Sequence, residues 1–357
     1  MRTRTLMAAL LATAAVTAGC GQDAGETSVA PAPDDPEAPA TGTLRFFAYG
    51  DTMTEEMLAP FEQQNPDLEL QKASFNSNKA AAAKLAGGFE ADVVEVCTDE
   101  MEPIVVRDLI RPLDPEAVAD FDDIALSDSD DVRNEAGEVL FVPASAGPHG
   151  LIINTDEIAD AGSYADLFDP QYAGRAALES SPLTAIGVTA MALGMDDPMD
   201  LSPPEIDEVK QHLLDNRDQF RDFPESDASM ANLFKSGEAV IADGGRGTTE
   251  AMIRDGVAAE WIAPEEGVLS WVCGLAITSD AKNVDAAYKL INYYASPEAQ
   301  AISGEQGFVA MNPDALALMP KEDRAAADPA SLDTAIPETQ PTSSDLYDRA
   351  WQEVSAG

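Results

Sequence analysis

Residues 43–75, TLRFFAYGDTMTEEMLAPFEQQNPDLELQKASF, decide the fold class of this 357-residue chain. The run Thr43–Ala48 is rich in residues that favour strands. From Thr54 the chain has acidic residues in a first helical turn and apolar residues at helical spacing, until an Asn-Pro pair ends the pattern at Pro66. A second strand follows at Leu68–Phe75. Strand, helix and strand in this order form the unit of a parallel sheet, so the sequence predicts an α/β fold.

Aromatic and polar side chains follow two of the predicted strands. The first strand ends at Ala48, and a third strand at Asp92–Val96 comes after an alanine-rich helix. Ligands of open α/β sheets lie beyond the carboxyl ends of strands. The residues at the end of the third strand, which we therefore consider for a binding site, are Cys97 and Asp99.

The second half of the chain continues the alternation of helices and strands. A helix with a capping box begins after Ser202, and a strand at Glu238–Ala242 runs into the glycine-rich loop DGGRG, residues 243–247. Two short strands, 139–143 and 151–154, are expected on either side of a loop, SAGPHG. About 310 residues follow Thr43, a length that favours two domains over one.

The N-terminus has the pattern of an export signal. Residues 1–20 combine a basic start with a short apolar stretch and small residues before Cys20, a pattern that resembles a bacterial lipobox. We expect Cys20 to be lipidated and to anchor the protein to the cell membrane on its extracytoplasmic side. Residues 21–42 are rich in Pro, Ala, Asp and Glu, which predicts a disordered tether.

The composition excludes several classes of partner and activity. The net charge is -44, so nucleic acid is excluded as a partner, because its binding depends on Lys and Arg at the phosphates. The acids either attract cationic ligands or simply make a solvated surface. The chain has two histidines, His149 and His212, and lacks a nucleophile elbow, a phosphate loop and metal-ligand spacing. We therefore predict neither catalysis nor a cofactor or metal.

Two cysteines remain after Cys20. In an oxidising compartment the pair Cys97 and Cys273 favours a disulfide. Two separately buried thiols, or a thiol that contacts the ligand, are the alternatives.

Several blocks together resemble one family. The chain is similar to the extracytoplasmic solute-binding proteins of ABC importers, and specifically to their spermidine/putrescine-binding group. The blocks that carry this resemblance are LRFFAYGD (44–51), NSNK (76–79), ADVVEVCTD (91–99), SYADLFDPQYAGR (163–175), KSGEAVIADGG (235–245) and EEGVLSWVCGLAI (265–277).

The resemblance implies a two-lobed periplasmic-binding-protein fold of the type II kind, with hinge strands that cross between the lobes. Lobe 1 would comprise residues 43–144 and 271–312, and lobe 2 residues 145–270 and 313–357. The lobes would close on a small polar solute, with a polyamine favoured, and a monomeric receptor would deliver it to a membrane permease.

The resemblance also assigns roles within the site. Tyr49 and Trp271 match aromatic residues that lie against the alkyl chain of the ligand, and an aromatic face also attracts ammonium groups. Asp51, Thr52 and Asp99 would supply polar partners. Cys97 and Cys273 would both fall at strand ends of lobe 1, where a bridge could form.

Two departures leave the charge of the ligand open. Cys273 stands where polyamine binders have an Asp, and Ala242 stands where they have a Trp. Asp99 or Asp243 could compensate for the lost carboxylate. Alternatively, Arg246 and the backbone of the DGGRG loop could bind a carboxylate or phosphonate.

Overall fold

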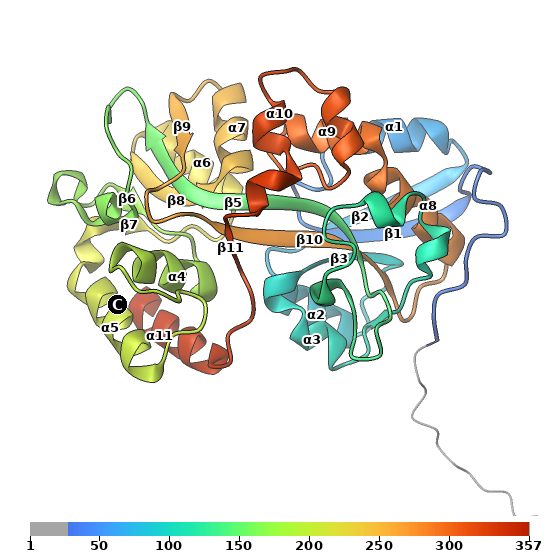
Figure 1. The fold of residues 1–357 in the computed structure, drawn as a ribbon, viewed down its shortest axis with the longest axis horizontal. Helices are drawn as coiled ribbons and strands as arrows, with labels where there is room; N and C mark the ends of the chain where they lie inside the picture. Colours follow the sequence, from blue (N-terminus) through green and yellow to red (C-terminus); the bar gives the residue numbers. More distant parts are fainter. Residues whose placement is uncertain (1–27, 357) are drawn as a thin grey trace, which may run out of the picture.

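Two strands run through the whole molecule and join its two halves. The computed structural model describes residues 28–356. In it β5 (Val142–Asn154) and β10 (Leu269–Thr278) pair in antiparallel fashion at the centre of a mixed sheet with the order β2-β1-β3-β10-β5-β8-β6-β7. Figure 1 shows these two strands crossing from one half to the other. The structure therefore has the two-lobed α/β architecture expected from the sequence.

The first lobe forms around the predicted strand-helix-strand units. Its strands β1 (Gly42–Ala48) and β2 (Leu68–Ser74) are parallel, and β1 also pairs in parallel with β3 (Val93–Cys97). The shorter β4 (Ile110–Arg111) pairs with β10. The helices of this lobe are α1 (Glu55–Gln64), α2 (Asn78–Ala86), α3 (Glu102–Val105), α8 (Val284–Ala295) and α9 (Pro297–Glu305).

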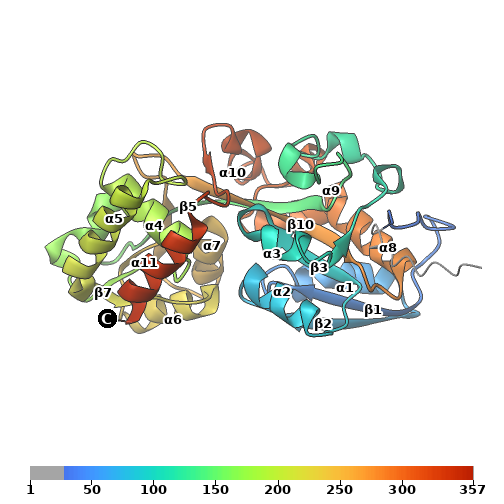
Figure 2. The ribbon, with the colours of Figure 1, turned by 90° about the horizontal axis from the view of Figure 1, so that it is seen from below.

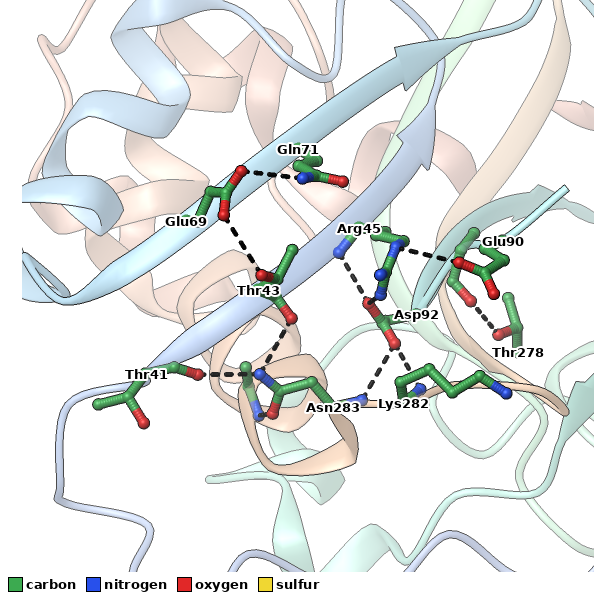
Figure 3. Close-up of polar contacts among 12 residues, drawn as sticks. Thr41, Thr43, Arg45, Glu69, Gln71, Glu90, Asp92, Thr278, Lys282 and Asn283 are labelled. Atoms are coloured by element: carbon green, nitrogen blue, oxygen red, sulfur yellow. Dashed lines mark hydrogen bonds and ion pairs between the residues drawn. The ribbon is translucent and has the colours of Figure 1, made fainter.

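Asp92 connects the strands of the first lobe to the turn before α8. Its buried carboxylate accepts hydrogen bonds from the backbone N–H of Arg45, Lys282 and Asn283 and forms an ion pair with the Arg45 guanidinium (Figure 3). A buried carboxylate needs such partners, because an isolated charge is costly to bury. The contacts fix where β3 begins, and with it the place where β3 ends at the site.

The second lobe has its own strands and helices. Its strands are β6 (Ala176–Ala177), β7 (Phe220–Asp222), β8 (Ile241–Gly245) and β9 (Ala259–Ile262). Its helices are α4 (Pro182–Ala192), α5 (Pro203–Asp215), α6 (Asp227–Ser236), α7 (Arg246–Arg254) and α11 (Ser344–Ala356). Figure 2 shows α4 to α7 and α11 grouped at one end of the molecule, with α1, α2 and α8 at the other. None of the helices in the described part of the chain is long and apolar enough to cross a bilayer.

The segment predicted as two short strands around a loop is instead continuous. Residues 142–154 form one strand, β5, which pairs with β10 and then β9 along one edge and with β8 along the other. Gly147 is needed here, because a Cβ at this position would lie 2.7 Å from Cζ2 of Trp271. The prediction of a loop at 145–150 was wrong because neighbouring strands hold this Gly- and Pro-containing stretch extended.

The last part of the chain lies along both lobes. The short segments Pro313–Ala317 and α10 (Arg324–Ala327) pack beside α9, where Ala315, Met319 and Ala327 share an apolar cluster with Ala301 and Ala310. The chain then pairs with β10 at β11 (Ile336–Pro337) before α11 packs against α4 and α5. The lobe boundaries given above stay a prediction. Because residues 313–327 pack beside α9 of the first lobe, these contacts favour a last crossing near β11 in place of residue 313.

The N-terminal segment lies against the first lobe where the structure describes it. Ala30 and Ala40 are buried, the Tyr288 hydroxyl donates to the carbonyl of Ala30, and Nζ of Lys289 donates to the carbonyl of Asp35. The tether expected over residues 21–42 stays a prediction, and these contacts show that residues 30–40 lie against the first lobe. The predicted signal peptide, 1–20, and the lipidation site Cys20 lie outside the described residues.

Candidate ligand-binding cleft

A cavity of about 870 Å³ lies between the lobes. Residues from both lobes and from both crossing strands line it, which places it at the carboxyl ends of β1 and β3 and at the start of α4, α6 and α7. Its volume is at the upper end of the range for small-molecule sites. The predicted site residues found in its lining are Tyr49, Asp51, Thr52, Asp99, Arg246 and Trp271.

The two predicted aromatic residues form part of the wall. The ring of Tyr49 packs edge-on against Phe75 with the ring centroids 4.5 Å apart. Trp271 packs against Phe308 with its ring above Gly147, and the centroids of the two rings are 5.8 Å apart. Each ring thus packs against a second aromatic side chain that also lines the cavity.

Three carboxylates gather on the wall of the first lobe. Glu95, in β3, is 2% exposed and accepts hydrogen bonds from the backbone N–H of Tyr49 and the hydroxyl of Thr52, both at 2.9 Å. Burial and the charge of Asp51 raise the pKa of Glu95 to about 8. Burial likewise raises the pKa of Asp51 to about 6. A cationic group between these carboxylates would relieve their repulsion.

Asp99 completes this acidic wall. Burial, then the nearby Glu338 and Glu100, raises the pKa of Asp99 well above its usual range. Its Oδ1 atom is buried and has no hydrogen-bond partner among the described residues. A buried acceptor without a partner is costly, so this atom is a natural contact for a ligand N–H.

A histidine and two more carboxylates lie where the lobes meet. Nε2 of His149, in β5, is 3.3 Å from Oε2 of Glu179, and its Nδ1 is 3.4 Å from Oε1 of Glu338. Glu338 also accepts a hydrogen bond from the hydroxyl of Thr184 at 3.0 Å. Although burial opposes the charged imidazolium, Glu179 and Glu338 raise the pKa of His149 to about 10. Burial raises the pKa of Glu179 to about 7.

Asp243 lies behind the cavity wall. Its side chain is fully buried, and its Oδ1 accepts a hydrogen bond from the backbone N–H of Glu179 at 2.7 Å. Burial raises the pKa of Asp243 to about 6. Asp243 therefore holds Glu179 in place and is absent from the cavity lining.

The basic groups at the cavity are already engaged. The predicted DGGRG loop is the end of β8 followed by the first turn of α7, and Arg246 donates from Nε to the carbonyl of Gly307 and from Nη2 to that of Phe308, at 2.9 and 3.3 Å. Lys79 pairs with Asp348 at 2.8 Å. These contacts reduce the support for an anionic ligand at Arg246, because its guanidinium already binds two carbonyl oxygens.

The two cysteines are joined by a disulfide. Cys97 ends β3 and faces Cys273 on β10, with the Cα atoms 4.0 Å apart. Both residues line the cavity. The position expected to carry a carboxylate thus ties the first lobe to a crossing strand instead.

Sequence reasoning missed four residues of the site. These are Glu95, His149, Glu179 and Glu338. Glu95 carried a usable signal, since it is the single charge within the strand VVEVC. Glu179 and Glu338 had none, because both follow very short strands that the sequence pattern does not reveal.

Comparisons with known proteins identify relatives of this chain. The spermidine/putrescine-binding periplasmic protein 1 of Haemophilus influenzae is 24% identical over 295 residues, which cover 80% of this chain and 79% of the relative. A putative spermidine/putrescine ABC transporter protein of Listeria monocytogenes superposes with a TM-score of 0.76 at 21% identity, covering 88% of this chain and 99% of the other.

The spermidine/putrescine ABC transporter substrate-binding protein of Streptococcus pneumoniae superposes with a TM-score of 0.72 at 20% identity, covering 88% and 97%. These structures show that the fold is that of two-lobed binding proteins. Residues 56–333, which are well over half of the chain, match the sequence family of bacterial extracellular solute-binding proteins. The chain therefore belongs to the bacterial extracellular solute-binding protein family.

Proposed function

We propose that this protein is the substrate-binding receptor of an ABC importer and that it captures a small polyamine of the spermidine or putrescine class. The observation that carries the proposal is the acidic wall of Asp51, Glu95 and Asp99, which lines the same cavity as Trp271. Carboxylates stabilise ammonium groups, and the aromatic faces of Tyr49 and Trp271 pack on methylene groups. The relatives named for spermidine and putrescine support the same solute class.

The proposal includes the location and partners of the receptor. Its Cys20 would carry the lipid anchor, and the monomeric protein would work outside the cytoplasm. A membrane permease would receive the solute when the lobes are closed. The family match and the two-lobed fold support this arrangement.

The deciding experiment is a calorimetric titration with putrescine and spermidine, with glutamate and a phosphonate as anionic competitors. We expect micromolar or tighter binding of an amine, and affinity that falls with added salt. Asp99→Asn should weaken amine binding at least tenfold, whereas the exposed Asp122→Asn should leave it unchanged. Binding of glutamate or the phosphonate with no amine binding would instead support the receptor for an anionic solute held by Arg246.

A further inference from the structure

His149 brings a positive charge into an otherwise acidic cavity. Its side chain is only 8% exposed and lies in the middle of the crossing strand β5. Glu179 approaches one ring nitrogen from the second lobe, and Glu338 approaches the other from the segment after β11. The imidazole therefore lies between two carboxylates that belong to different parts of the chain.

The acidic wall of the first lobe has no such partner. Among the ion pairs of the described residues, none involves Asp51, Glu95 or Asp99, although the pairs of His149 and Lys79 lie on the same cavity. Asp51, Glu95 and Asp99 thus line the cavity without a cation in an ion pair, whereas Glu179 and Glu338 already share a histidine. The two groups adjoin, because Glu338 lies near Asp99.

We propose that His149 is a built-in cation which occupies the place of one ligand ammonium group and so makes the receptor select a diamine over longer polyamines. This proposal rests on the proposed function and adds a residue that determines specificity. An ammonium group bound by Asp51, Glu95 and Asp99 meets carboxylates that form no ion pair with a cation among the described residues. An additional ammonium near Glu179 and Glu338 meets an imidazolium as well, and like charges in a desolvated site repel strongly.

Charge, and not the volume of the cavity, supports this assignment. The groups that face His149 are Glu179, Glu338 and the more distant Asp243, and their negative charges outweigh the burial that opposes protonation. The raised pKa of His149 keeps the ring charged at neutral pH. Since the cavity holds about 870 Å³, its volume alone does not reject a triamine. In this proposal the preference for a diamine over a triamine therefore comes from charge.

The test compares putrescine with spermidine by calorimetry in wild type and in His149→Gln, which keeps a hydrogen-bonding side chain. We expect wild type to bind putrescine more tightly, and His149→Gln to shift the ratio of the two dissociation constants toward spermidine by about tenfold or more. His212→Gln is the matched control, because His212 lies on α5 against Phe168 and is not part of the cavity lining. An unchanged ratio in His149→Gln would overturn the proposal.

A second measurement does not depend on the ligand. The chain has two histidines, so the spectrum of His212→Gln assigns the ring signals of His149 in an NMR titration. We expect His149 to remain protonated well above pH 8, and titration near its ordinary pKa would overturn the built-in cation. If neither amine binds, the proposed function fails and the selectivity fails with it. Amine binding with an unchanged ratio overturns the selectivity alone.

Discussion

Replacing Glu95 with Gln should make the ligand-free protein more stable at alkaline pH. The pKa of Glu95 is raised from 4.5 to about 8 by burial and by the charge of Asp51. Because the folded pKa lies above the unfolded one, the stability that this group contributes is fully present below pH 4.5 and is lost as pH rises through about 8. Wild type therefore loses stability across this window, and Glu95→Gln does not lose that part of it.

The magnitude follows from the two pKa values. The interval between 4.5 and about 8, at about 1.4 kcal/mol per pH unit, sets an upper limit of about 5 kcal/mol. We expect a measured difference of about 2 to 5 kcal/mol at pH 9, because neighbouring Asp51 titrates with Glu95 and shares the effect. The amide can still accept from the Tyr49 N–H and donate to the Thr52 hydroxyl, so the local hydrogen bonds persist.

Urea denaturation of wild type and Glu95→Gln at pH values from 4 to 9 measures this difference. Glu116→Gln is the matched control, since that side chain is exposed. The same Glu95→Gln protein should bind the amine more weakly, so greater stability and lower affinity should appear together. Parallel curves of stability against pH for wild type and Glu95→Gln would refute the reasoning, because they would mean that Glu95 has the same pKa in the folded and unfolded chain.

Three further changes test the hinge and the N-terminal segment. Gly147→Ala places a methyl group 2.7 Å from Cζ2 of Trp271, so we expect the ring to move and amine binding to weaken at least tenfold in calorimetry; an unchanged affinity would contradict the role of the ring. Replacing both Cys97 and Cys273 with Ser should lower the free energy of unfolding by up to about 5 kcal/mol in urea denaturation, because the bridge spans 176 residues, and equal stability would contradict this. Lys289→Ala removes a donor to the carbonyl of Asp35, so hydrogen exchange in the N-terminal segment should become faster, and unchanged protection would show that the other contacts suffice.

The fold could be predicted from the sequence where local pattern and tertiary structure agree. The first strand-helix-strand unit has β-prone runs around an amphipathic helix, and α1 and the flanking strands form close to the expected bounds. The middle of β5 could not be predicted. Its Gly and Pro residues favour a turn locally, and only pairing with β10 and β8 keeps them extended.

The site was predictable in part for the same reason. Asp99 lies two residues after the recognisable strand β3, so its place at the cavity could be inferred, and the resemblance indicated the place of Tyr49, which directly follows β1. The contact of His149 with Glu179 and Glu338 joins three segments that are far apart in the sequence. No local pattern indicates such a contact, and in so acidic a chain each Glu resembles a solvated surface residue.

The structure also accounts for the loss of a carboxylate at position 273. The sequence left open whether Asp99 or Asp243 compensates for it. Asp243 accepts a hydrogen bond from the backbone N–H of Glu179 and lies outside the cavity lining. Asp99, by contrast, lies in the lining, two residues beyond Cys97. The disulfide fixes the end of β3 to β10 and so fixes the start of the turn that carries Asp99. In the proposed receptor, Cys273 stands where the resemblance places an anionic anchor, and its disulfide holds the segment that carries Asp99, the carboxylate that we propose in its place.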